Sequence, residues 1–266
     1  MISIKLARSL RAGPGLAFLL LALFINQAIV AEPVPPQMFA RRAADAYQLA
    51  QAQYQAATNA SPAAWQFARA CYYLADIATN DENRASLAVQ GIAACRQFLR
   101  EQPKSGVGHY WLGMNLGQLA RTELLGALAL VREMEEEFKT TWNLDTSVDH
   151  AGAARSLGLL YREAPGWPTS IGSKYKAREW LERAARTAPD FPENWLVLTE
   201  SHLTWNEPTA ARDSLRQLLK IWPSAHTNFT GVAWEADWAD WNARRTAAQL
   251  TLAEETSPLK AARKSN

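Results

Sequence analysis

The sequence predicts an all-α protein in which helical hairpins stack into a solenoid, with one further helix at each end. The first observation is a pattern that occurs twice between residues 151 and 223. The earlier copy reads Leu157-Gly158-x2-Tyr161, Ala177-x3-Leu181 and Pro189, and the later copy reads Trp195-x2-Leu198, His202, Ala211-x3-Leu215 and Pro223. The second observation is the period, because the two prolines lie 34 residues apart.

Together the two copies contain most of the tetratricopeptide pattern, W-x2-L-G-x2-Y, A-x3-F and P, which has a period of 34 residues. Two earlier units follow from the same spacing of apolar and small residues. The four predicted hairpin units span about 62–103, 106–146, 151–189 and 192–223. The third unit has an insertion between its helices, Pro165–Gly172. Each hairpin leaves one apolar face that it cannot bury alone, so neighbouring units must stack.

Helices are expected on both sides of the repeats, so that the array covers residues 38–256. Apolar residues recur at helical spacing from Met38 to about Thr58. The final helix, about residues 233–253, carries Trp234, Trp238 and Trp241 on one face. This helix could cap the last repeat or present an exposed aromatic docking face. Residues 257–266 are polar and basic and are expected to form a disordered tail.

Residues 1–31 have the pattern of a signal peptide. Lys5, Arg8 and Arg11 precede an apolar run, and Ala31 offers a cleavage site before a proline-rich linker at 32–37. This indicates export, and a retained membrane anchor is the alternative. Removing the segment changes the net charge from +2 to about −1, because it carries three basic residues and no acidic one. A near-neutral chain gives no general reason to bind nucleic acid or an anionic membrane.

Several stretches resemble the T component of tripartite ATP-independent periplasmic transporters. They are His109-Tyr110-Trp111-Leu112-Gly113-Met114-Asn115, Asp149-His150-Ala151-Gly152, and Ala164-Pro165-Gly166-Trp167-Pro168 leading to Ser173-Lys174. The resemblance covers roughly residues 60–225. It implies an all-helical periplasmic protein that associates with a solute-binding subunit and takes small apolar ligands. Members of that group are commonly lipoproteins, and the sequence has no cysteine near the cleavage site.

The sequence does not predict an enzyme. It lacks the motifs of serine hydrolases, zinc proteases and phosphate-binding loops, and it implies no cofactor or metal. His109, His150 and Asp149 could meet through stacking of the units, although capping and packing roles explain them more simply.

A binding function is therefore the leading hypothesis. The first helix of each hairpin in such arrays lines the inner side. The usual inward spacing selects Gln66, Tyr73, Tyr110, Met114, Gln118, Arg155, Leu159 and Arg162. Their mixture of aromatic and cationic groups would suit a partner peptide or a small amphiphilic acid. The alternative function is a periplasmic scaffold that joins other exported proteins without a small ligand. For each residue, packing between repeats is an equally good explanation.

Two smaller sites are also considered. Ser173 and Lys174 stand at a predicted helix N-terminus, where backbone N–H groups and a cation favour an anion, while a packed loop pinned by Trp167 is the alternative. Cys71 and Cys95 are the only cysteines, and an oxidising compartment would allow a disulfide between them. The expected hairpin register offsets them by about 6 Å or more along the helices, so free thiols remain the alternative.

Overall fold

The computed structural model describes residues 36–57, 61–123 and 126–255. The helices are α1 (Pro36–Ala56), α2 (Ala63–Asp76), α3 (Asp81–Glu101), α4 (Gly106–Ala120), α5 (Ala127–Leu144), α6 (Gly152–Glu163), α7 (Lys174–Thr187), α8 (Pro192–Thr204), α9 (Pro208–Asn228) and α10 (Glu235–Glu255), with a 3₁₀ turn at Val232–Trp234. No strand occurs in these ranges, so the all-α prediction is confirmed for them. The predicted signal peptide and the predicted tail lie outside the described residues.

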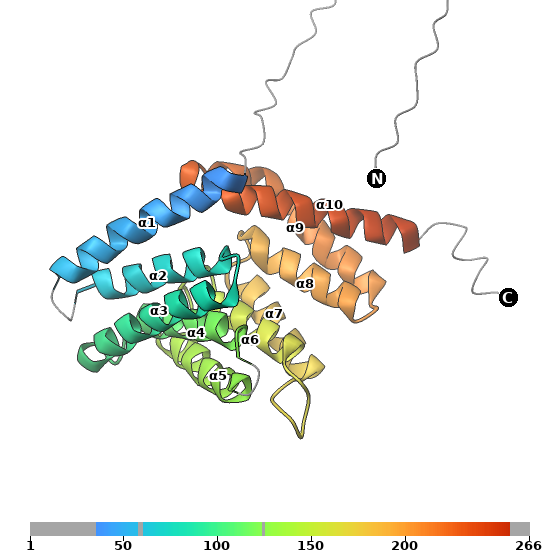
Figure 1. Cartoon of the computed structure of the whole chain (residues 1–266). Coiled ribbons are helices and arrows are strands. Elements are labelled where there is room, and N and C mark those ends of the chain that lie inside the picture. The colour runs from blue at the N-terminus through green and yellow to red at the C-terminus, as the bar shows by residue number, and fades with distance from the viewer. Residues whose placement is uncertain (1–35, 58–60, 124–125, 256–266) are drawn as a thin grey trace, which may run out of the picture. The chain divides into compact units, whose positions relative to one another are not determined.

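Consecutive helices pack as four antiparallel hairpins, α2–α3, α4–α5, α6–α7 and α8–α9 (Figure 1). Helix α1 lies along α2, and α10 packs against α8 and α9. The first three hairpins fall within the ranges expected for their repeat units, and the fourth continues past its expected end to Asn228. None of the helices in the described ranges is long and apolar enough to cross a membrane.

Glycines allow the two helices of a hairpin to approach closely. A Cβ atom at Gly158 of α6 would stand 2.5 Å from Cγ and Cδ2 of Leu181 on α7. At Gly113 of α4, a Cβ would stand 2.7 Å from the ring of Phe138 on α5. Only a residue without a side chain permits these separations, so the Leu-Gly element of the repeat has a direct steric reason.

Side-chain caps define where several helices begin. The side chains of Asn80, Ser105 and Ser173 each accept a hydrogen bond from a backbone N–H in the first turn of α3, α4 and α7. These bonds satisfy donors that have no partner inside the helix, which is why such residues favour this position.

The tryptophans of the last helix turn toward the protein. Trp241 is buried, and its neighbours Trp234 and Trp238 pack against the same cluster, which includes Phe191 and Phe229. The indole N–H of Trp238 also donates to the carbonyl of Phe229 at 2.7 Å. The helix therefore caps the last repeat, and the exposed docking face considered for these tryptophans is not formed.

Two helix boundaries differ from expectation. Helix α9 continues through Pro223, where the sequence suggested the end of a unit. Trp222, Ala225 and Phe229 continue its buried stripe, whereas Pro223 faces solvent. Burial of the aromatic residues thus outweighs the loss of one backbone hydrogen bond. Helix α1 begins at Pro36, inside the predicted linker, because proline fits the first turn of a helix.

Candidate binding face

Three exposed residues follow one side of α2 at positions i, i+3 and i+7: Gln66, Arg69 and Tyr73. We call this set the inner stripe. The opposite side of α2 is buried against α1 and α3 through Phe67 and Cys71. The Arg69 guanidinium lies over two aromatic rings, 5.5 Å from the centre of Tyr73 and 5.7 Å from that of Trp111 on α4. A cation is thus held over an aromatic surface next to an exposed amide.

The charges around Tyr73 have opposite effects on its hydroxyl. Partial burial raises the pKa of Tyr73, the Arg69 guanidinium lowers it, and the carboxylates of Asp149 and Asp237 raise it. Burial also raises the pKa of Asp237 to about 6, and Glu193, Asp149 and Asp240 contribute to this rise. The first and last helices also meet, because Arg42 of α1 pairs with Glu235 of α10 at 2.6 Å.

Beneath this face, a buried polar network ties three units together. The Tyr110 hydroxyl donates to Oδ2 of Asp149 at 2.6 Å, and Arg155 forms an ion pair with the same carboxylate. Arg155 also donates to Oδ1 of Asn194 at 2.9 Å. The Asn194 amide in turn donates to the carbonyl of His150 at 3.0 Å. Burial and the Asp149 carboxylate raise the pKa of Tyr110, so its hydroxyl stays a donor. The network joins α4, α6 and α8.

This network corrects the predicted inner face. Tyr110 is 1% exposed, Gln118 is 3% exposed and Arg155 is 8% exposed, so these side chains are not available to a partner. Gln118 uses its amide within the protein, where it donates to Asp76 at 3.0 Å. Helical spacing within one segment does not show how deeply neighbouring helices cover a residue.

The other predicted residues have intermediate or full exposure. Met114 and Leu159 are half-buried, and Leu159 packs against Leu181 and Val197. Arg162 donates to Ser201 at 2.6 Å and pairs with Glu163 at 2.6 Å. Gln66 and Tyr73 are exposed. The predicted set therefore does not form one continuous groove.

Helix α10 occupies the corresponding side of the last repeat. Arg244 pairs with Glu193 at 3.0 Å and Glu200 at 2.7 Å, both on α8. The indole N–H of Trp241 donates to Glu193 at 2.7 Å. In this part of the array, a helix of the chain itself covers residues that could otherwise face a partner. Of the predicted inner residues, the two exposed ones, Gln66 and Tyr73, both lie on α2.

The predicted anion site at the start of α7 is not free. The Ser173 hydroxyl accepts a hydrogen bond from the Lys176 N–H at 3.3 Å, and Lys174 pairs with Glu207 at 2.8 Å. Glu207 also pairs with Arg178 at 2.6 Å. Hydrogen bonds from Lys174, His202 and Arg178 lower the pKa of Glu207 to about 2. A carboxylate of the protein thus already satisfies these cations.

Cys71 and Cys95 are both buried free thiols, so the disulfide considered from the sequence is not formed. Burial raises the pKa of Cys71 to about 12 and that of Cys95 further still.

The metal site considered for His109, His150 and Asp149 is not formed, because the two histidines have different partners. His109 contacts Glu137 at 2.5 Å, whereas His150 stacks on Phe191, and the described residues contain no group of three metal-ligating side chains.

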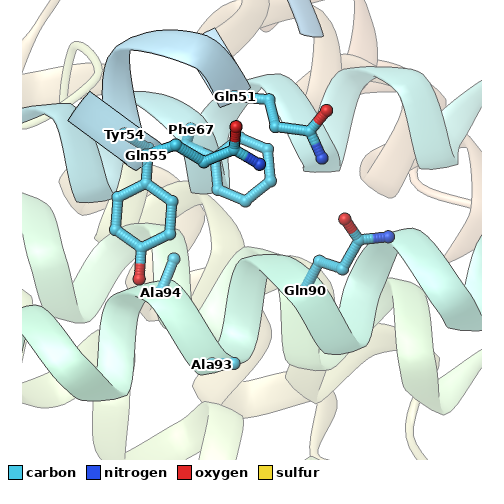
Figure 2. A pocket seen from close by; sticks show the side chains of 7 residues that line it. All are labelled: Gln51, Tyr54, Gln55, Phe67, Gln90, Ala93 and Ala94. Carbon is cyan, nitrogen blue, oxygen red and sulfur yellow. The ribbon is translucent and has the colours of Figure 1, made fainter. Parts of the chain in front are cut away.

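A shallow cleft of about 270 Å³ lies elsewhere, between α1 and α3 (Figure 2). Gln51 and Gln55 of α1, Gln90 of α3 and the ring of Phe67 line it, with no charged residue in the lining (Figure 2). The Gln90 side chain accepts from Tyr47 at 2.7 Å, which ties α3 to α1. The cleft therefore offers amide groups but no acid, base or cationic group for chemistry.

Comparison with known proteins supports the fold. The structure is similar to the crystal structure of a thermophilic TPR protein from Thermus thermophilus, with a TM-score of 0.50 and 18% sequence identity, covering 80% of this chain and 98% of that one. The chain is therefore an all-α, TPR-like array of helical hairpins. A family model described as regulator of microtubule dynamics protein 1-3 matches residues 37–136, from α1 into α5. No curated protein matches the sequence significantly.

Sequence reasoning did not select Arg69, the cation of the inner stripe. Its spacing of three from Gln66 and four from Tyr73 was available in the sequence. The contact with Trp111 was not, because it depends on how α2 and α4 pack.

Proposed function

We propose that the chain is a non-enzymatic scaffold that binds a partner protein through the inner stripe of α2. The observation that carries this proposal is the exposed Arg69 guanidinium, which lies over the rings of exposed Tyr73 and buried Trp111. Arginine and aromatic residues that are already held in place form strong protein contacts, because little conformational entropy is lost on binding. The TPR-like fold supports the same reading, since stacked hairpins present extended binding surfaces.

The proposal also includes where the protein is located and which protein it binds. The pattern of residues 1–31 favours export to the periplasm. The sequence resemblance favours association with the solute-binding subunit of a tripartite ATP-independent transporter. A general envelope scaffold without a small ligand is the alternative. The matched family description, which concerns microtubule dynamics, adds a third class of partner to be tested.

Affinity capture from the source cells tests these partners. The bait is the wild-type chain, the double variant Arg69→Gln/Tyr73→Ala, or the control Arg41→Gln, which removes one exposed charge from α1. Captured proteins are compared by mass spectrometry, and binding to purified microtubules is measured separately. The proposal expects one partner to be lost only with the double variant. Capture of the same proteins by all three baits would remove the inner stripe as the binding surface.

A further inference from the structure

The loop between α6 and α7 carries the most exposed aromatic side chain among the described residues. Trp167 exposes 89% of its surface, and Tyr175 in the first turn of α7 exposes 77%. The sequence suggested that Trp167 would pin this loop by packing, and the structure shows the opposite. The loop extends away from the end of the hairpin (Figure 1).

Backbone hydrogen bonds fix the conformation of the loop, and packing of Trp167 does not. The Gly172 N–H donates to the Pro165 carbonyl at 2.9 Å, and the Ser173 N–H donates to the Tyr161 carbonyl at 2.9 Å. A Cβ at Gly172 would stand 2.0 Å from the Ala164 carbonyl oxygen, so the two sides of the loop touch at its base. An exposed indole on such a held loop needs little further ordering to bind a surface.

Basic residues lie close in sequence to the two aromatic residues, and two of them, Lys174 and Arg178, already pair with Glu207. Residues 164–178 contain Lys174, Lys176 and Arg178 and no Asp or Glu. Three nearby carboxylates already have partners within the protein. Glu163 pairs with Arg162, and Glu207 pairs with Lys174 and Arg178. Glu135 accepts a hydrogen bond from Tyr161 and pairs with Lys139. Lys176 is exposed, with its ammonium 5.1 Å from the centre of the Tyr161 ring. Exposed tryptophan, tyrosine and lysine within residues 167–176 suit the interface between a bilayer and water.

From these features we infer that the α6–α7 loop docks the protein on an anionic membrane surface. Trp167 and Tyr175 would enter the headgroup region, and Lys176 would approach the lipid phosphates. Shallow entry of two aromatic rings needs less buried area than the roughly 800 Å² that each partner of a stable protein interface contributes. A few aromatic and cationic groups give weak, reversible membrane binding.

A local probe separates this loop from every other membrane contact of the full chain. Thr169 is exposed on the loop, and a Thr169→Cys variant can carry an environment-sensitive maleimide dye. The natural thiols are buried with raised pKa values, so they do not compete for the label. Ser224→Cys, an exposed position on α9, provides the matched control.

Vesicles of phosphatidylglycerol and phosphatidylethanolamine should shift the dye emission to shorter wavelength at position 169 and not at 224. Vesicles of phosphatidylcholine should have little effect. Trp167→Ser should abolish the shift with an unchanged melting temperature, and Lys176→Gln should raise the lipid concentration needed by about fivefold. A silent probe at 169, equal shifts at both sites, or a shift that survives Trp167→Ser would overturn the inference. So would cross-linking of this loop to an envelope protein without any response to vesicles. None of these outcomes affects the proposal for the inner stripe.

Discussion

Replacing Gly158 with leucine tests the packing between α6 and α7. The first side-chain carbon alone would lie 2.5 Å from Cγ and Cδ2 of Leu181, where carbon atoms normally stay about 3.5–4.0 Å apart. The same carbon would lie 3.1 Å from the backbone nitrogen of Leu181, so a change of rotamer does not remove the overlap. Leu181 is fully buried, which leaves the rest of the new side chain no open space.

The expected cost is therefore at the upper end of the range for overpacking, about 3 kcal/mol. For a domain of this size each kcal/mol shifts the melting temperature by about 2–4 °C, so Gly158→Leu should melt about 6–12 °C lower. Thermal unfolding followed by circular dichroism measures this difference.

Gly117→Ala in α4 is the matched control. Its Cβ would come closest to Cε of Met134, at 3.0 Å, which is the end of a flexible side chain. The gain in helix propensity of about 1 kcal/mol should leave this variant as stable as the wild type or more stable. A melting temperature for Gly158→Leu within about 2 °C of the wild type would refute the packing described here.

Three further predictions concern buried polar groups. Arg155→Met should lower stability by about 3 kcal/mol in thermal unfolding, because it leaves a carboxylate without its cation, whereas Arg162→Ala should cost less than about 1 kcal/mol. Comparable losses would show that Arg155 is not the buried link between units. Asp237→Asn should stabilise the protein at pH 7.5 by about 1–2 kcal/mol and leave it unchanged near pH 3. The folded-state pKa of about 6 lies above that of the unfolded chain, so ionisation favours unfolding as the pH rises from about 4 to 6. Chemical denaturation at both pH values measures the effect, and equal stability of both proteins at pH 7.5 would contradict it. Finally, a maleimide at pH 8 should modify Cys71 and Cys95 only after denaturation, as read by mass spectrometry, and rapid labelling of the native protein would contradict their burial.

Local signals in the sequence predicted the helices well. The repeat pattern places Gly158 where the side chain of Leu181 leaves no room for a Cβ atom. Ser173 caps the start of α7, because its hydroxyl accepts a hydrogen bond from a backbone N–H of the first turn. Pro223 was misleading because its local preference opposes a helix, while the aromatic residues on either side of it favour one. The helix boundary was decided by tertiary packing.

The candidate binding face was harder to predict. The polar groups of Tyr110 and Arg155 are engaged by Asp149 and Asn194, and Asn194 comes from a later repeat unit. Helix α10 packs against α8, and the periodicity of a single segment does not predict which distant helix will cover it. Exposure of Trp167 also contradicts the ordinary tendency of large aromatic residues to be buried.

The most direct test of the account is site-specific photocross-linking from the inner stripe in living cells. A photoreactive phenylalanine analogue replaces Tyr73 on α2, and the same analogue at Val89, exposed on α3, serves as the control. The account predicts a discrete adduct with one partner protein from position 73 and no such adduct from position 89. The same adducts from both positions, or an adduct from position 89 alone, would contradict a binding function for the inner stripe.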